Sequence, residues 1–132
     1  MKQFILSLDF DGCIVDNKYP EIGNLKPHAA DVIRNLYETG HTIIINSCRA
    51  GDREKDMRQF LQEQKIPYDH INNNSGLKIA KYGFDTRKIS ADIYIDDLNI
   101  FCTKIDWQEI KEEIERRAKV ECVTWIEEES EE

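Results

Sequence analysis

The chain has 132 residues, a length typical of one domain that buries a sizeable core. Its 26 acidic residues outnumber its 18 basic ones, and the formal net charge of -8 argues against a general nucleic-acid binder, because phosphate backbones need a basic face. The apolar stretch near the N-terminus is too short for a signal peptide or a membrane span, and the spacing of the four cysteines argues against zinc or thioredoxin-like chemistry. We therefore expect a cytoplasmic protein without a membrane segment.

Apolar segments with strand-like and helix-like spacing alternate along the chain, which favours an α/β fold. We expect a three-layer sandwich, with a central, mostly parallel Rossmann-like sheet and helices on both faces. Residues 1–126 should form this single core, and the almost wholly acidic residues 127–132 should form a disordered tail. Helices are expected after Pro27, from an N-cap at Asp52, over residues 77–82, and from a capping box of Asp106 and Glu109. Strands are expected at about residues 3–10, 41–46, 68–71 and 92–95, with a last edge strand at 123–126.

Two aspartates follow the first strand, one residue apart. Side chains alternate between the faces of a strand, so Asp9 and Asp11 project to the same side. Burying two unpaired carboxylates is costly unless a cation lies between them. A second acidic pair, Asp96 and Asp97, ends the strand at residues 92–95, and two neighbouring carboxylates repel each other without a nearby positive charge. Together the two pairs offer the hard oxygen ligands that suit Mg²⁺.

A third polar cluster, Asn46 and Ser47, ends the second strand. In open α/β sheets, ligands lie beyond the carboxyl ends of the strands, and all three clusters fall at such ends. Each cluster alone could be an ordinary turn, since aspartate and serine are common turn residues. Their coincidence indicates a ligand site.

These segments resemble the haloacid dehalogenase superfamily of phosphohydrolases, particularly its small members without a cap domain. The first motif of that family, D-x-D-x-[TV], is similar to residues 9–13, and the second, an apolar strand ending in serine or threonine, is similar to residues 43–47. The third is a lysine, best matched by Lys88, and the fourth, a strand ending in an acidic pair, is similar to residues 94–97. Cys13 departs from the first motif, and we interpret it as a small buried hydrophobe, because acidic neighbours oppose a reactive thiolate.

The resemblance implies a role for each acidic residue. Asp9 would attack phosphorus and form an aspartyl-phosphate. Asp11 would protonate the leaving oxygen and then deprotonate the water that releases phosphate. Mg²⁺ would be held by the Asp9 carboxylate, the backbone carbonyl of Asp11 and one acid of the last pair. We favour Asp97 as that ligand, with Asp96 in a supporting role.

The resemblance also implies groups that hold the phosphate. Ser47 and the backbone N–H of Cys48 would bind the transferring phosphoryl group, and Lys88 would offset the charges of the nucleophile and the phosphate. Arg49 could contact the substrate or close a surface ion pair. Two other lysines also lie between the second and fourth motifs, so the choice of Lys88 stays open: Lys78 and Lys81.

The gaps between the motifs have no room for a full cap domain. The first gap holds a short flap at about residues 16–26, one helix and one strand, and the second holds about two helices and a strand. The site should therefore be open, with the flap or a neighbouring subunit of a homo-oligomer selecting the substrate. We expect a Mg²⁺-dependent phosphomonoester hydrolase that acts on a small phosphorylated metabolite.

Two other functions share these features. A nucleotidase or polynucleotide-end phosphatase would use the same four motifs, although the acidic charge makes long nucleic acid the less favoured substrate. A receiver-like signalling domain also carries clustered acids, Mg²⁺ and a lysine on a parallel sheet. Receivers place the phosphate-accepting aspartate on a later strand, and the position of Asp11 as acid and base indicates turnover rather than a lasting phosphoprotein.

Overall fold

A computed structural model describes residues 1–130 of the chain and the side chains of residues 1–120. Within that part, four parallel strands form one sheet in the order β3-β2-β1-β4. This confirms the predicted α/β fold with a central parallel sheet. In chain order the elements are β1 (Ile5–Asp9), α1 (Ala29–Glu38), β2 (Thr42–Asn46), α2 (Asp52–Glu63), β3 (His70–Ile71), α3 (Gly76–Tyr82), β4 (Ile93–Ile95) and α4 (Trp107–Ser130).

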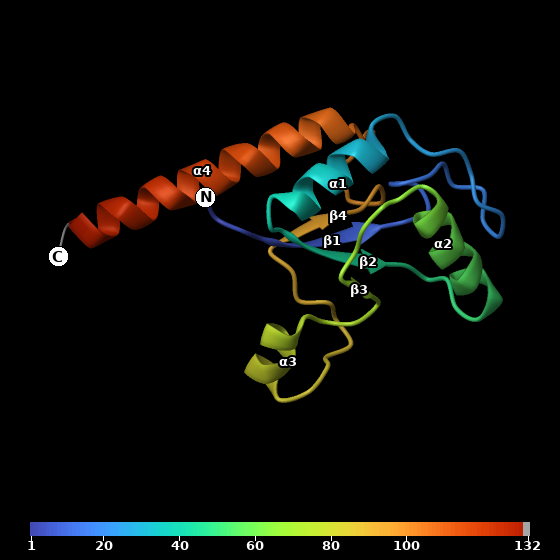
Figure 1. Ribbon diagram of the computed structural model, residues 1–132, viewed down its shortest axis with the longest axis horizontal. Coiled ribbons are helices and arrows are strands. Elements are labelled where there is room, and N and C mark those ends of the chain that lie inside the picture. Colours follow the sequence, from blue (N-terminus) through green and yellow to red (C-terminus); the bar gives the residue numbers. More distant parts are fainter. Residues whose placement is uncertain (131–132) are drawn as a thin grey trace.

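The helices cover the two sides of the sheet unequally. α1 and α4 pack against each other, and Figure 1 shows both above the sheet. Together with α2 they enclose one apolar cluster, to which β1 contributes Leu6 and Leu8. α3 lies on the other side of the sheet from α1 and α4 in Figure 1, and it buries none of its residues. The sandwich therefore has one thick helical layer and one thin one.

Residues 10–26 form an excursion between β1 and α1. The backbone carbonyl of Phe10 accepts hydrogen bonds from the N–H groups of the next tight turn, including that of Ile14 over 3.0 Å. The N–H of Asp16 then donates to the carbonyl of Asn24 over 2.9 Å and closes the base of a loop. This loop, residues 16–26, is the predicted flap, and we keep that name for it.

The predicted edge strand at residues 123–126 is wrong, because these residues belong to α4. Their β-branched side chains suggested a strand, but no glycine or proline interrupts the chain between Trp107 and Ser130. The predicted acidic tail at residues 127–132 begins inside this helix, and residues 131–132 lie outside the described residues.

The two predicted helix caps have different outcomes. Gly51 is the N-cap of α2, so Asp52 is the first helical residue rather than the cap. Asp106 does cap α4, since its Oδ1 accepts hydrogen bonds from the backbone N–H groups of Gln108 and Glu109, each over 3.1 Å. This cap fixes the start of α4 beside the loop that follows β4.

Candidate functional site

The carboxyl ends of three strands meet at one edge of the sheet. β1 pairs with β2 so that Asp9 lies opposite Asn46. β1 also pairs with β4 so that Leu8 lies opposite Ile95. The three polar clusters that follow these strands are therefore brought to the same edge, as the sequence predicted.

Asp9, Asp97 and Cys13 form a close group of potential metal ligands at this edge. One ligand atom from each residue lies within 4.8 Å of the others. Burial raises the pKa of Asp9, and the neighbouring charges of Asp96 and Asp97 raise it further, from 3.8 to about 7. A hydrogen bond from the backbone N–H of Phe10 to Asp9 Oδ1, 3.0 Å long, opposes this shift only in part. The protein therefore supplies too little positive charge beside Asp9 to balance the carboxylates gathered at this edge.

Within this group the two carboxylates are the candidate metal ligands, and Cys13 is a neutral neighbour. The Cys13 side chain is fully buried, and burial together with the charge of Asp9 raises the pKa of its thiol well above the usual value. Its Sγ lies 3.8 Å from the carbonyl oxygen of Ile95 and 3.9 Å from Asp97 Oδ1, as a weak donor would. A thiol that keeps its proton is a poor metal ligand. The remaining donor set is two carboxylates, which fits a hard cation such as Mg²⁺.

Gly12 and Trp107 hold the loop after β1 against Asp97. Gly12 has a φ of +94°, and a Cβ atom there would lie 2.2 Å from Asp97 Oδ2. The indole Nε1–H of the buried Trp107 donates to the carbonyl oxygen of Cys13 over 2.9 Å. A glycine is therefore required for the close approach of the loop and the Asp97 carboxylate. No sequence signal linked Trp107 to the site, because its hydrogen bond to Cys13 joins residues 94 positions apart.

The two acids that follow β4 have different surroundings. Asp97 belongs to the ligand group with Asp9, which supports the choice of Asp97 as the direct ligand. Asp96 Oδ1 accepts a hydrogen bond from the backbone N–H of Leu98 over 2.9 Å, as in an Asx turn. Its charge still reaches Asp9, because it contributes to the raised pKa of that residue.

Asp11 is bound by Arg49 through two parallel hydrogen bonds. Arg49 Nε lies 2.8 Å from Asp11 Oδ2, and Arg49 Nη2 lies 2.8 Å from Asp11 Oδ1. Only 1 % of the Arg49 surface is exposed, so this is a buried ion pair rather than a surface one. Of the two roles that the sequence left open for Arg49, the structure shows an ion pair, but the predicted surface location is wrong because the guanidinium is buried.

Ser47 and Cys48 lie directly after β2. The Ser47 backbone N–H donates to Asn72 Oδ1 over 2.7 Å, and Ser47 Oγ accepts from the backbone N–H of Arg49 over 3.1 Å. Among the described residues, the backbone N–H of Cys48 has no hydrogen-bond partner. The turn thus keeps one main-chain donor free at the strand end.

The structure does not bring Lys88 to the carboxylates. Its Nζ lies 5.6 Å from the centre of the Tyr94 ring, and within the described part of the chain it forms no hydrogen bond or ion pair with Asp9. The loop that carries it is organised by Asn74, whose buried side-chain amide donates to the carbonyl of Lys88 over 3.3 Å and accepts from the N–H of Ser90 over 2.6 Å. The two alternative lysines are on α3: Lys78 and Lys81.

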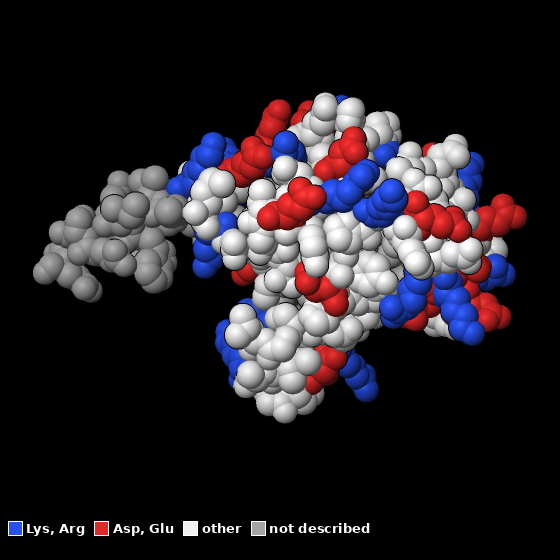
Figure 2. Space-filling view, in the orientation of Figure 1, with Lys and Arg blue, Asp and Glu red and all other residues white. Residues whose placement is uncertain are grey.

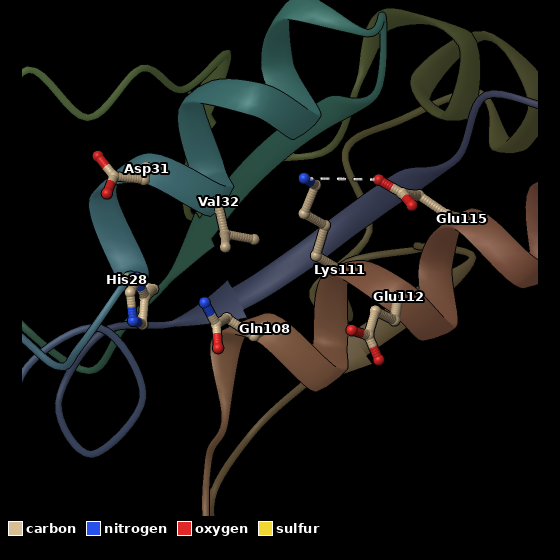
Figure 3. Close-up of a pocket in the computed structure, with 7 residues that line it drawn as sticks. All are labelled: His28, Asp31, Val32, Gln108, Lys111, Glu112 and Glu115. Atoms are coloured by element: carbon tan, nitrogen blue, oxygen red, sulfur yellow. Dashed lines mark ion pairs between the residues drawn. The ribbon is translucent and has the colours of Figure 1, made fainter.

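A hollow lies away from this group, between α1 and α4. Figure 3 shows that side chains of both helices line it, including Asp31, Glu112 and an ion pair of Lys111 with Glu115. None of the residues in the ligand group lines it. Figure 2 shows acidic and basic side chains interspersed over the viewed face, which gives that face a mixed charge despite the net negative balance. Because this hollow contains none of the clustered carboxylates, we place the candidate site at the strand ends rather than between α1 and α4.

Comparison with known proteins identifies a structural relative. No family model matches the chain, and no curated protein matches it. A solved structure of a conserved protein coded by a locus of Bacteroides thetaiotaomicron has a TM-score of 0.78 and 29% sequence identity, over 88% of this chain and 93% of that one. None of the helices in the described residues has the length and apolar character needed to cross a membrane. The similarity to this solved structure covers most of the α/β fold of the chain.

Proposed function

We propose that the protein is a Mg²⁺-dependent phosphomonoester hydrolase in which Asp9 is the nucleophile. The observation that carries this proposal is the convergence of Asp9 and Asp97 at the end of the sheet, with ligand atoms within 4.8 Å and a raised Asp9 pKa. Such a pair is stabilised by a cation, and a carboxylate beside a cation is suited to phosphoryl transfer. The order of the four motifs that resemble the haloacid dehalogenase superfamily adds support.

The reaction would have two steps. In the first, an Asp9 carboxylate oxygen attacks phosphorus and the bond to the leaving oxygen breaks. Asp11, protonated at an oxygen lone pair that Arg49 does not use, passes its proton to the leaving oxygen. In the second, water attacks the phosphorus of the aspartyl-phosphate, its proton passes to Asp11, and the bond to Asp9 breaks. The products are an alcohol and inorganic phosphate, and both aspartates return to their starting forms.

The Asp9 and Asp97 carboxylates would hold the metal, with the backbone carbonyl of Asp11 as the third protein ligand that the resemblance implies. When bound, Mg²⁺ would supply positive charge beside the nucleophile and the phosphate oxygens. Asp96 would support this arrangement by shaping the turn after β4, through its hydrogen bond to the backbone of Leu98.

The phosphoryl group would be held by Ser47 Oγ and the free backbone N–H of Cys48, which are donors of the type used for developing negative charge. Lys88 remains the proposed counter-charge, and it would have to leave the Tyr94 ring to reach the phosphate. The segments between the motifs form only the flap and short elements in the described residues, so the site would be open to a small phosphorylated metabolite.

Release of inorganic phosphate from p-nitrophenyl phosphate tests this proposal. We expect turnover with Mg²⁺, none with EDTA, and a loss of at least about 10³-fold in Asp9→Asn, because the nucleophile is removed. Asp31→Asn, an exposed aspartate of α1 paired with Arg34, is the matched control and should retain wild-type turnover. Mg²⁺-dependent turnover that persists in Asp9→Asn would refute the assignment of the nucleophile.

A further inference from the structure

We propose that Arg49 is a positioning residue that joins Asp11 to the flap and orients the Asp11 carboxylate for proton transfer. The catalytic half of this inference rests on the proposed function. The structural half, a link between Asp11 and the flap, stands independently of it.

The guanidinium group of Arg49 binds both partners at once. While two of its N–H groups hold the Asp11 carboxylate, Nη1 donates to the carbonyl oxygen of Pro20 over 3.1 Å and Nη2 donates to that of Glu21 over 2.9 Å. Pro20 and Glu21 lie in the flap, whereas Asp11 follows β1 at the candidate site. One side chain thus connects the proposed acid and base to the backbone of the loop beside it.

Two aromatic rings also contact the Arg49 guanidinium group. The Arg49 guanidinium carbon lies 5.1 Å from the centre of the Tyr19 ring, which belongs to the flap, and 5.5 Å from that of Phe10, which is buried in the core. Both distances are within the range of a cation–π interaction. The flap therefore contributes a side chain as well as two carbonyl groups to the surroundings of Arg49.

Few donors of Arg49 remain for a substrate. A guanidinium has five N–H groups, and four hydrogen bonds to Asp11, Pro20 and Glu21 use four of them. The side chain is also almost fully buried. Arg49 is consequently suited to orient Asp11 rather than to bind phosphate. A lysine could not replace it, because its compact ammonium lacks the planar fork that binds a carboxylate at two points.

Leaving-group dependence is the first test, with Arg49→Lys as the variant. A poor leaving group such as an alkoxide needs a proton from Asp11 to depart, whereas p-nitrophenolate is a stable anion that departs without one. We expect kcat for an alkyl phosphate to fall on the order of 10²-fold and kcat for p-nitrophenyl phosphate to fall less than about tenfold, as for the loss of general acid catalysis. Equal losses on both substrates, or a rise in KM alone, would overturn the catalytic half.

Trypsin cleavage after Lys18 is the second test, and it does not depend on activity. Lys18 lies in the flap, and the other flap lysine, Lys26, precedes Pro27 and resists trypsin. We expect cleavage at Lys18 to be on the order of tenfold faster in Arg49→Lys and also faster in Asp11→Asn, since charge-assisted hydrogen bonds are lost in both. Unchanged cleavage in both variants would overturn the link between Asp11 and the flap.

Two controls make the outcomes distinct. Arg58→Lys alters an exposed arginine of α2 that pairs with Glu54, and it should change neither leaving-group dependence nor cleavage. Asp11→Asn is nearly isosteric, so it carries the cleavage test if Arg49→Lys fails to fold. If the wild type hydrolyses no phosphomonoester, the proposed function fails, and the cleavage rates alone decide whether Arg49 joins Asp11 to the flap.

Discussion

Gly12 determines how closely the loop after β1 approaches the Asp97 carboxylate. In Gly12→Ala the new methyl group would lie 2.2 Å from Asp97 Oδ2, so the carboxylate must move. We expect Mg²⁺ affinity to fall about 10–100-fold, the range found when groups that orient a metal ligand are changed. Backbone strain at a φ of +94° should also lower the free energy of unfolding by about 1–2 kcal/mol. Calorimetric Mg²⁺ titration and urea denaturation measure the two effects.

Gly83→Ala is the control for Gly12→Ala. Gly83 has a φ of +84°, but a Cβ atom there meets nothing within 4 Å. The control should therefore lose a similar free energy of unfolding and keep wild-type Mg²⁺ affinity. Equal affinity losses in both variants would mean that strain, rather than displacement of Asp97, weakens the metal site.

The raised pKa of Asp9 predicts a pH-dependent stability of the metal-free protein. Its folded-state pKa, about 7, lies above the unfolded value of 3.8, so the folded state binds more protons between these values. The contribution of protonated Asp9 to the free energy of unfolding is therefore fully present below about pH 4 and is lost as the pH rises through 7. The stability of Asp9→Asn relative to the wild type should therefore increase from pH 4 to pH 8 in EDTA. Thermal denaturation at several pH values tests this, and a pH-independent difference would contradict it.

At the scale of elements, α4 anchors the loop that follows β1. Trp107 begins this helix, and its indole N–H holds the carbonyl oxygen of Cys13. Trp107→Phe leaves that buried acceptor without its partner, which should lower the free energy of unfolding by about 1–3 kcal/mol. Because the loop also touches Asp97, Mg²⁺ affinity should fall as well. Urea denaturation and Mg²⁺ titration measure both effects.

Tyr94→Phe serves as the comparison for Trp107→Phe. It removes a hydroxyl that donates to the carbonyl of Ile89 over 2.5 Å, a hydrogen bond outside the β1 loop. It should lower stability without altering Mg²⁺ affinity. Unchanged Mg²⁺ affinity in Trp107→Phe would show that α4 supports the fold but does not position the site.

The elements that the sequence predicted best are those bounded by glycine, proline or polar turns. β1, β2 and α1 are flanked by such residues, and their predicted positions differ from the observed ones by a few residues at most. α4 was predicted too short because its later apolar and β-branched residues resemble a strand. Local propensity cannot choose between helix and strand for so short a segment without a breaker to mark the boundary.

At the scale of the whole molecule, strand order explains which parts of the site could be predicted. Parallel strands align their carboxyl ends, so the meeting of Asp9 with Asp97 follows from two strand predictions. The Arg49–Asp11 pair could not be predicted, because it joins residues 38 positions apart and depends on how the flap folds back. The position of Lys88 depends in the same way on a loop organised by the buried Asn74.

Mass spectrometry of the acid-quenched protein tests directly whether Asp9 is the nucleophile. We would mix p-nitrophenyl phosphate with Asp11→Asn in the presence of Mg²⁺, since this variant should form the aspartyl-phosphate but hydrolyse it slowly. We expect one phosphoryl group on the peptide that contains Asp9, and we expect it to be absent when Asp9 is also changed to Asn or when EDTA is present. Wild-type turnover without any adduct, or an adduct on another residue, would show that Asp9 is not the nucleophile. A stable adduct without wild-type turnover would instead favour a receiver-like domain.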